Sequence, residues 1–451
     1  MQAGHAPCRV RQSTGCTPLP RMTPSVSGVT SVMHIVVVGA GIIGLTSAHA
    51  LLEAGHHVTL IDSASGPASG TSHRNGAQMS YAFVAPLASA DTLRSLPSLL
   101  LDRQSPLRFR PGLSPAIWRW CLRFLWACNS RQAMATTRGL LELARTSQQQ
   151  FTQWRSRHAD AQIHFQRNGK LVLYRDARSW EAAQRQLAAQ AAWGPPQQLC
   201  DASQCVDIEP ALRADRAPLA GGVLTPGEEV ADCAMVCRQL LHDVRGHPRF
   251  EARWRTRALR WKTTRTRAVA LLAEDADGLA SHLGADGFVV ANGVNAPALL
   301  RPLDTHLPVA PLKGYSIELP AASLAHCPTH SITDSARKVV FAPLGDGADR
   351  RLRVAGMAEL VGHDLRIDAG RIEQLLDATH HCFGVIDRPA DIHPWAGLRP
   401  ATPTGLPVIG AARAWPNVFI NAGHGALGQT LSFGAAARLC SLIDQGLRPG
   451  P

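Results

Sequence analysis

The most regular pattern of apolar and polar residues lies near the beginning of the chain. Four consecutive apolar residues, Ile35 to Val38, are typical of a strand buried on both faces of a parallel sheet. A helical pattern follows from Ile42 to Glu53 and is closed by Gly55, a residue favoured just after the end of a helix. A second apolar run follows at 58–61. This stretch predicts a strand, a helix and a second strand that begin a parallel sheet.

The turn between the first strand and the helix carries glycines at the spacing G-x-G-x-x-G. Gly39 permits a tight turn, Gly41 lets the backbone approach a pyrophosphate, and Gly44 lets the helix pack closely on the strand. The N-terminus of the helix offers N–H groups and the positive end of its dipole to phosphates. Asp62 lies about 20 residues further on, where a carboxylate accepts hydrogen bonds from an adenosine ribose and repels the 2′-phosphate of NADP. The sequence therefore predicts a dinucleotide site rather than an ordinary strand–helix turn, with further cofactor contacts from Ala40, Ile42 and Ile43.

The middle of the chain alternates between helical and strand patterns. Strands at 163–165 and 171–174 are predicted to form a hairpin around the turn dipeptide Asn168-Gly169. A buried strand that begins at Phe288 ends in glycine and precedes a helix, so the chain is expected to return there to the parallel sheet, with the end of the strand at the cofactor. The same periodicities predict a largely helical region at 87–160, helices at 177–193, 231–245 and 371–383, a short helix capped by Asp201, and a meander of strands at 250–272.

Strands dominate again in the last third of the chain. Their alternation between 308 and 360 predicts an antiparallel sheet. The closing segment places Gly423, Gly425 and Gly428 before a helix of small residues. The N-terminus of that helix can stabilise developing negative charge, so this turn is a second candidate for a ligand contact.

Composition limits the classes of protein to which the chain can belong. The 451 residues are 45% hydrophobic and 18% charged, which allows a large core in two or three domains. No apolar run approaches the roughly 18 residues that a membrane-spanning helix needs. The net charge of +12 reflects either general solubility or attraction to an anionic membrane surface or acidic partner, and no nucleic-acid module accompanies it. The 11 cysteines are scattered without histidines at zinc spacing, so we expect reduced thiols and no metal site.

Two segments bear on localisation. Residues 1–32 have no acid and no apolar run of a secretory signal, so we expect a disordered leader or a gene-model extension before Met33. Residues 116–128 form a helical pattern, after Ser114 and Pro115, in which tryptophans alternate with arginines. This helix either packs on its own core or contacts a membrane interface, where Trp and Arg are favoured together. We expect a cytoplasmic protein that is peripheral on the inner face of the cell membrane.

Six ordered motifs resemble those of a known enzyme family. They are VVVGAGIIG, TSHRNGAQMS, PLKGYSIELP, RVAGMAELVG, GLRPATPTGLPVIG and NAGHGALGQT. The set is similar to that of the FAD-dependent D-amino acid dehydrogenases, within the D-amino acid oxidase and glycine oxidase superfamily. The resemblance implies an α/β fold, with a Rossmann-like FAD-binding domain and an inserted mixed-sheet α+β substrate domain that covers the flavin. The implied domains are 33–86, 200–303 and 395–447 for FAD, and 87–199 and 304–394 for the substrate.

The resemblance also assigns cofactor contacts along the chain. The ADP half of FAD would be held by Gly39, Gly41, Gly44 and Asp62. The family's second flavin loop would contain Ser72, Asn75 and Gln78. The flavin ring would face Gly423, His424 and Gly425.

The substrate contacts that the resemblance implies are fewer. Arg399, in G-L-R-P, matches the arginine that holds the substrate carboxylate in relatives, and a buried structural ion pair is the alternative. Tyr315, in K-G-Y, is a candidate for the pocket wall. We name no catalytic acid or base, because a histidine between glycines, such as His424, is more often a flavin contact than a base.

The chain departs from the family pattern at two places that line up with the flavin loops. It has Asn75-Gly76-Ala77-Gln78 where the dehydrogenases usually have Asn-Ala-Gly-Gln, and Gln429 where a Trp is usual. These departures bear on substrate range more than on flavin binding.

The implied reaction is oxidative deamination of D-amino acids to 2-oxo acids and ammonia. Cα–H would leave as a hydride to the flavin, and the imine would hydrolyse in water, so the protein needs chiefly to orient Cα and bind the carboxylate. Electrons would then pass to a quinone or another respiratory-chain acceptor. Two alternatives stay open: a glycine- or sarcosine-type amine oxidase that uses oxygen, and a non-catalytic flavin-binding module.

Overall fold

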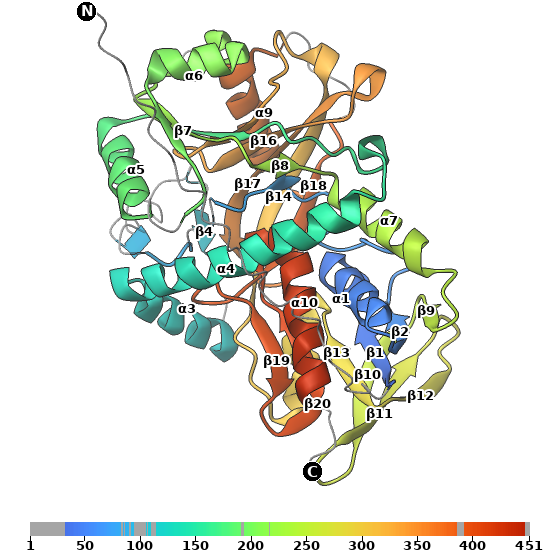
Figure 1. The fold of residues 1–451 in the computed structure, drawn as a ribbon. Coiled ribbons are helices and arrows are strands. Elements are labelled where there is room, and N and C mark those ends of the chain that lie inside the picture. The colour runs from blue at the N-terminus through green and yellow to red at the C-terminus, as the bar shows by residue number, and fades with distance from the viewer. Residues whose placement is uncertain are drawn as a thin grey trace, which may run out of the picture. The chain divides into compact units, whose positions relative to one another are not determined.

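The structure is a computed structural model that describes residues 32–446, except 83, 85, 90–91, 94–104, 106, 110–113, 191–193, 216 and 386–391. The chain divides into two units, residues 1–31 and 32–451, and the first lies outside the described residues. The predicted leader, apart from Val32, and parts of the predicted helical region at 87–160 therefore lie outside the description. The described elements of the second unit form two large sheets with helices packed against them (Figure 1).

The predicted strand–helix–strand unit is confirmed, and it lies in a six-stranded sheet of the described chain. β1 (His34–Val38) pairs in parallel with β2 (His57–Ile61) on one side and with β13 (Gly287–Val290) on the other. β1 and β2 run in the same direction because α1 (Ile42–Glu53) carries the chain back between them. The predicted return of the chain at β13 is also confirmed. The strand order is β19 (Val408–Ala412), β20 (Trp415–Ala422), β13 (Gly287–Val290), β1 (His34–Val38), β2 (His57–Ile61) and β9 (Phe250–Arg253), with β19 antiparallel to β20.

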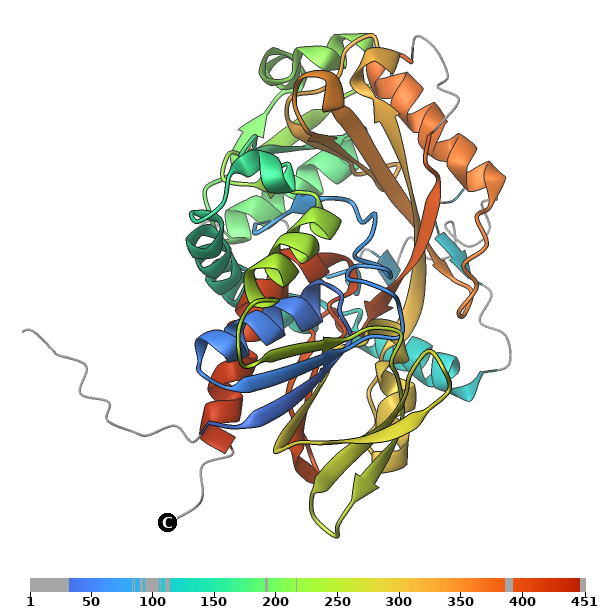
Figure 2. The same cartoon turned by 90° about the vertical axis from the view of Figure 1, so that its right-hand side faces the viewer.

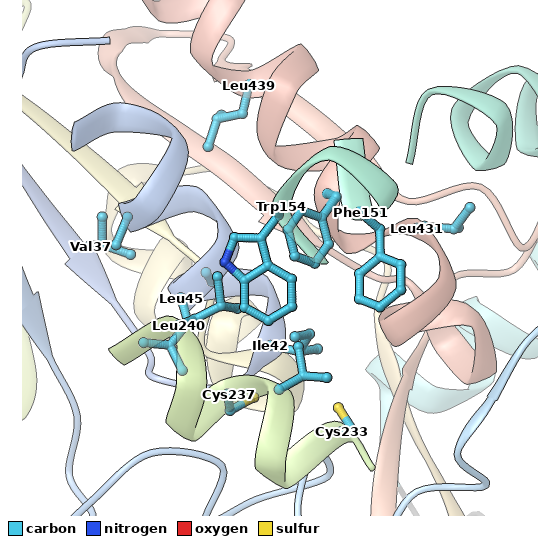
Figure 3. Close-up of a cluster of buried hydrophobic side chains, with 14 of the residues drawn as sticks. Val37, Ile42, Leu45, Phe151, Trp154, Cys233, Cys237, Leu240, Leu431 and Leu439 are labelled. Carbon is cyan, nitrogen blue, oxygen red and sulfur yellow. The ribbon is translucent and has the colours of Figure 1, made fainter. Parts of the chain in front are cut away.

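Alternate residues of β1 are buried on opposite faces of this sheet. Ile35 and Val37 join a core with four helices: α1, α4 (Ser130–Arg155), α7 (Cys233–Val244) and α10 (Gly428–Gly446). Within it, Phe151 and Trp154 of α4 lie against the other three helices (Figure 3). Val36 and Val38 join a second core under α8 (Ala296–Leu300) and a small antiparallel sheet of β10 (Arg257–Thr263), β11 (Ala268–Glu274) and β12 (Ala280–Gly284). The central strand is thus buried on both sides, as its unbroken apolar run predicts.

The second large sheet has nine strands in the described residues and is mixed. Its order is β18 (Trp395–Ala401), β14 (Ala310–Pro320), β17 (Arg351–Leu360), β16 (Val339–Leu344), β15 (Ser331–Asp334), β5 (Lys170–Tyr174), β7 (Gly221–Thr225) and β6 (Gln198–Cys200), with β4 (Leu107–Phe109) also paired to β17. The antiparallel pairing predicted between 308 and 360 is confirmed for β14 to β17 and for β15 with β16. α9 (Ala369–Phe383), orange in Figure 2, packs on the core of this sheet together with α6 (Ala202–Ile208).

The remaining described strands and α-helices belong to neither large sheet. They are the short pair β3 (Gln78–Met79) and β8 (Glu229–Val230), and the helices α3 (Pro115–Ala127) and α5 (Ala177–Gln190). Asp201 caps α6 as predicted, because its carboxylate accepts a hydrogen bond from the backbone N–H of Gln204. The domain boundaries given above stay a prediction; β7 and β18 belong to the nine-stranded sheet.

The predicted hairpin between 163 and 174 is wrong. Asp160–Ile163 forms a 3-10 turn instead of a strand, and β5 pairs in parallel with β15 and antiparallel with β7. The predicted turn at Asn168-Gly169 is present, since Gly169 has a φ of +70°, a left-handed conformation that glycine adopts readily in turns. β5 finds its partners more than 40 residues away in the chain, and no local pattern reports them.

The described residues also bear on membrane spans, disulfides and metal sites. None of the described helices combines the length and the apolar character required to cross a membrane. The nine described cysteines are free thiols, most of them buried. No cluster of three or more metal-ligating side chains occurs in the same part of the chain.

Candidate active site

A cleft of about 2120 Å³ runs between the two large sheets of the described residues. Its walls include the glycine turn after β1, Asp62, the loop at 69–78, parts of β14, β17 and β18, and the turn before α10. Sites for small ligands usually occupy about 300–1,000 Å³, so this cleft can hold a dinucleotide and a small substrate together. It brings together all the stretches from which the sequence predicts site residues.

The turn after β1 needs its glycines for steric reasons. Gly39 has a φ of +107°, and a side-chain Cβ there would lie 2.8 Å from the Ala291 carbonyl oxygen. A Cβ on Gly44 would lie 1.7 Å from the carbonyl oxygen of Gly39, so α1 can begin this close to β1 only without a side chain. The N–H of Ile42 donates to the Ser72 hydroxyl at 3.0 Å, which links the turn to the second loop. Gly41, Ile42 and Ile43 line the cleft at the positive end of α1.

Asp62 fixes the turn from the end of β2. Its Oδ2 accepts from the Ala40 N–H at 2.6 Å and its Oδ1 from the Ala64 N–H at 2.8 Å. A carboxylate has about four acceptor positions, so two remain for the hydroxyls of a ligand. Asp62 lines the cleft and can accept a ribose at the place that the spacing predicts.

The loop that contains Asn75 and Gln78 is held by bonds within the protein. Asn75 Nδ2 donates to Gln429 Oε1 at 2.8 Å, and Asn75 Oδ1 accepts from the Ala77 N–H at 3.0 Å. Ala77 has a φ of +56°, in a region that glycine adopts with less strain. Gln78 Nε2 donates to the carbonyl of Ile332 on β15 at 3.0 Å. The loop is therefore tied to the nine-stranded sheet and to α10, and the departure at position 429 supplies one of the ties.

His424 is the most isolated polar side chain in the cleft wall. It is 2% exposed, and neither ring nitrogen has a hydrogen-bond partner among the described residues. Burial lowers the pKa of His424 to about 3, so the ring is neutral at physiological pH. The flanking glycines make this turn possible, since Gly423 has a φ of +88° and Gly425 one of +55°. A buried polar group without a partner needs an explanation, and a bound ligand supplies one.

Arg399 crosses a neighbouring strand to reach the cleft. It lies on β18, but its Nη1 donates to the Met357 carbonyl at 2.7 Å, and its Nη2 lies 3.4 Å from the Gly356 carbonyl, both on β17. The guanidinium passes over Gly314 of β14, where a Cβ would lie 2.3 Å from Nη2. A register shift between β14 and β17, with Met357 at a φ of +64°, accompanies this contact.

The charge of Arg399 has no acidic partner among the described residues. In the described part of the chain no carboxylate lies within ion-pair distance of it, so the alternative of a structural ion pair is not supported there. Burial lowers the pKa of Arg399 from 12.5 to about 10. A desolvated guanidinium with two neutral carbonyl partners and a free edge in a cleft is suited to bind a carboxylate.

Tyr315, which follows Gly314 on β14, is buried and borders the same cleft. Its hydroxyl donates to Glu359 Oε2 at 2.8 Å, and this carboxylate together with burial raises the pKa of Tyr315. Glu359 also accepts from Arg371 at 2.7 Å. The hydroxyl is therefore committed to the protein. The ring joins the hydrophobic core that includes α9, and Tyr315 also borders a second, smaller cavity together with Lys313 and Glu359.

Comparisons with known proteins agree with this geometry. The family model described as "DAO: FAD dependent oxidoreductase" matches residues 34–442. The chain belongs to this family. It is 43% identical over 421 residues to D-amino acid dehydrogenase 2 of Ralstonia nicotianae, covering 91% of this chain and 96% of the relative. It is 38% identical over 423 residues to D-amino acid dehydrogenase 2 of Pseudomonas aeruginosa, covering 92% and 95%.

Solved structures give the same fold at lower sequence identity. Glycine oxidase from Bacillus cereus aligns with a TM-score of 0.67 at 16% identity, over 92% of this chain and 95% of that one. L-proline dehydrogenase from P. horikoshii aligns with a TM-score of 0.69 at 16% identity, over 92% and 94%. The predicted fold class is therefore confirmed, and so is FAD as the cofactor of this oxidoreductase.

The residues in the cleft of this DAO-family protein fit an FAD molecule. Gly39 and Gly41 line the cleft, so backbone without side chains faces a phosphate there, and Asp62 keeps acceptor positions open. His424 and the buried Oδ1 of Asn292 lack partners in the described chain, and both residues line the cleft. Together these features form a cradle whose open polar groups require a polar ligand.

Several residues that complete the site are not predicted from the sequence. Gly314 lies in the quoted K-G-Y motif, but its part in making room for a guanidinium depends on the pairing of β14 with β18. The carbonyl of Met357 is aimed by a local register shift. Lys170, one of four lysines in the chain, also lines the cleft, and the return strand β13 ends close to Asn292. The contacts of Gly314 and of the Met357 carbonyl with Arg399 depend on strand pairing, which cannot be read from the linear sequence.

Proposed function

We propose that this protein oxidises D-amino acids to 2-oxo acids and ammonia, by hydride transfer from Cα to FAD. The observation that carries the proposal is Arg399: a desolvated guanidinium without a carboxylate partner in the described chain, in the wall of the cofactor cleft. The curated relatives with the highest identity given above carry the name D-amino acid dehydrogenase, which supports the substrate class.

The proposed cofactor contacts divide along the cleft. The glycine turn and Asp62 would hold the ADP half of FAD, with the positive end of α1 at the pyrophosphate. The loop at 72–78 and the turn at 423–425 would face the flavin, where His424 and Asn292 have open polar atoms. When bound, FAD supplies the hydride acceptor.

The protein residues then need only to bind and orient the substrate. Arg399 would pair with the carboxylate through the free edge of its planar guanidinium, which fixes Cα relative to the cofactor. Tyr315 would limit the cleft beside it. His424 is not suited to act as a base at neutral pH, because its pKa is about 3. We therefore assign no side chain the removal of a proton from carbon, and hydride transfer requires none.

We further propose that the electrons pass to a lipid-soluble quinone, at an anionic membrane surface that α3 contacts. The inner face of α3 is anchored beside the active site, since Trp120 donates Nε1–H to the carbonyl of Ala401 at 2.8 Å and stacks on Phe124. Both rings line the cleft. The opposite face is exposed and apolar, with Leu122 64% and Trp126 90% exposed. An exposed apolar face of this kind needs a partner.

The charge around α3 favours an anionic bilayer as that partner. Between Asp102 and Glu142 the sequence contains seven arginines and no acid. Two of them, Arg119 and Arg123, are exposed on α3 among the apolar side chains. Interfacial helices combine tryptophan and arginine in this way, and each basic residue near an anionic surface contributes about 1 kcal/mol.

The activity is tested by anaerobic reduction of the bound flavin. Purified protein that carries FAD should be bleached by a D-amino acid and not by its L-enantiomer, followed at the flavin absorption band. Bleaching by neither enantiomer under conditions where dithionite reduces the flavin would contradict the proposal. Formation of hydrogen peroxide in air, in place of dye reduction, would instead favour the amine oxidase alternative.

A further inference from the structure

A buried lysine at the edge of the cleft has no part in the function proposed so far. Lys170, the first residue of β5, is 4% exposed and lines the cleft. Its Nζ donates to the Ser80 hydroxyl at 2.7 Å. The Ser80 hydroxyl in turn hydrogen-bonds the Glu228 carboxylate. Three side chains from separate parts of the sequence thus form one chain of hydrogen bonds that begins at the cleft.

Glu228 is the inner end of this chain and is held firmly. It is 1% exposed, and its two carboxylate oxygens accept from the N–H groups of Tyr81 at 2.9 Å and Ala82 at 2.7 Å. Buried carboxylates are retained in proteins when such donors compensate for the loss of water. Ser80, Tyr81 and Ala82 follow closely after Gln78, the end of the second loop, so these hydrogen bonds hold the backbone that continues from the cleft wall.

The position of Ser80 relates this chain to α10. The backbone N–H of Ser80 donates to the Thr430 hydroxyl at 3.1 Å, in the first turn of α10. The N-terminus of α10 borders the cleft and carries the positive end of the helix dipole. The Lys170 ammonium and this helix end therefore act on the same part of the cleft, where they favour negative charge.

Lys170 lies too far from Arg399 to contact an amino acid that Arg399 holds. The Arg399 guanidinium reaches β17, whereas Lys170 is on β5, three strands further across the sheet. At 4.7–4.9 Å between neighbouring strands, this is roughly 14 Å. The amine and carboxylate of an α-amino acid share a single carbon atom, so Lys170 does not contact either of these groups when Arg399 holds the carboxylate. We place Lys170 at the cofactor portion of the cleft because Ser80 links it to the first turn of α10.

The pair is poised to change charge near neutral pH. Burial lowers the pKa of Lys170 to about 8 against the opposing effect of Glu228, and burial raises the pKa of Glu228 to about 7. The pair of Lys170 and Glu228 is therefore cationic below about pH 7, a neutral ion pair between about pH 7 and about pH 8, and anionic above about pH 8. Other charged groups on the adjoining elements are Glu229 with Arg167 on the β8 side, and Asp334 with Arg175, Arg337 and Lys338 on the β15 side.

We propose that Lys170, Ser80 and Glu228 form a proton acceptor that compensates the negative charge delivered to the cofactor when the substrate is oxidised. In that oxidation the Cα–H bond breaks, its electron pair leaves as a hydride, and a C=N bond forms to a nitrogen that has already lost one proton. The hydride carries one negative charge to the cofactor. Lys170 passes a proton to the Ser80 oxygen, Ser80 passes its own proton to Glu228, and the Lys170 amine takes one proton from the cleft. The inference rests on the proposed placement of FAD in this cleft.

The test is the pH dependence of the two-electron potential of bound FAD, measured from about pH 6 to about pH 9 by anaerobic dye-coupled reduction. Each proton taken up with two electrons changes the equilibrium tenfold per pH unit, which is about 30 mV. If reduction adds one proton to the flavin and none elsewhere, the potential changes by this single-proton amount per pH unit. If Lys170, Ser80 and Glu228 take up a second proton, the change per pH unit is doubled. We expect the wild type to approach the doubled slope above about pH 7, because negative charge on the cofactor raises the pKa of both groups.

The double variant Lys170→Met with Glu228→Gln should keep the single-proton slope throughout, and it leaves no unpaired charge buried. Lys262→Met, which removes an exposed lysine on β10, is the matched control and should keep the wild-type slope. A single-proton slope in the wild type would overturn the proposal, as would a doubled slope in the double variant. If the double variant loses FAD, Glu228→Gln alone is compared with the wild type. The reductant is a dye couple, so the outcome does not depend on whether D-amino acids are oxidised.

Discussion

Replacing Arg399 with methionine should abolish the preference for carboxylate substrates while leaving the protein at least as stable. A fall of the Arg399 pKa from 12.5 to about 10 corresponds to a desolvation cost of up to about 3.5 kcal/mol, at about 1.4 kcal/mol per pKa unit. Because the pKa is lower in the folded chain than in the unfolded one, this cost is present at every pH below about 10 and declines above it. Methionine removes the charge and retains much of the apolar volume.

The loss of function follows from the bonds that the substrate would lose. A hydrogen bond to a charged partner contributes about 1.5–3 kcal/mol, and a guanidinium makes two to a carboxylate. Their removal should lower kcat/KM by roughly 10²- to 10⁴-fold, with kcat reduced as well, because Cα would no longer be fixed over the cofactor. Lysine at this position should restore the charge and only part of the rate, since it lacks the planar two-point geometry.

The assay compares anaerobic flavin reduction by a D-amino acid and by its amide in wild type and variant. Arg74→Met is the matched control, because Arg74 also lines the cleft and donates to a backbone carbonyl, that of His393 at 2.9 Å. It should keep the preference for the acid, and both variants should keep their FAD. The reasoning fails if Arg399→Met retains the full preference, if the wild type does not distinguish acid from amide, or if Arg74→Met is the variant that loses it.

Three further predictions concern the supports of the site and its surroundings. Gly314→Ala should reproduce the selective defect of Arg399→Met with normal FAD content, because the new Cβ would lie 2.3 Å from the guanidinium; an unchanged acid preference would contradict this. Asp62→Ala should weaken FAD binding by about 1–3 kcal/mol in a flavin fluorescence titration, and an unaltered Kd would argue against a ribose contact. Trp126→Ser should reduce binding to anionic vesicles in a sedimentation assay, whereas Leu279→Ser, at an exposed apolar residue between β11 and β12, should not. Binding should weaken as salt rises, since screening shortens the field to about 10 Å at 0.1 M, and absence of binding at low salt would remove the membrane proposal.

The parts of this protein that sequence predicts well are those whose causes are local. The turn at Gly39 and Gly44 can be read from the chain because its strand, glycines and helix are contiguous, and the structure shows the close contacts that exclude side chains there. Helices such as α7 and α9 follow from capping residues and periodicity, since Asp232 and Asp368 accept bonds from the first turns. The same local signals predict a dinucleotide, whereas FAD in particular was implied by the resemblance of six motifs spread along the chain.

The parts that sequence could not predict depend on which strands become neighbours. β5 was assigned to a hairpin because Asn168-Gly169 is a strong turn signal, yet its partners are β15 and β7. The surroundings of Arg399 have the same origin, because Gly314 and the carbonyl of Met357 lie near it only once β14 has paired with β18 and β17. A motif can therefore indicate the substrate-binding residue without indicating what holds it.

The choice of partners for Arg399 explains why its charge is available to a ligand. A carboxylate beside it would neutralise the guanidinium and compete with the substrate, whereas two backbone carbonyls orient the group without cancelling its charge. Glu359 hydrogen-bonds Tyr315 and Arg371, and it lines a second, smaller cavity instead of the cleft. On this view the stability lost by leaving a guanidinium desolvated is recovered only when an anionic substrate binds, so the same arrangement that costs stability gives preference for a carboxylate.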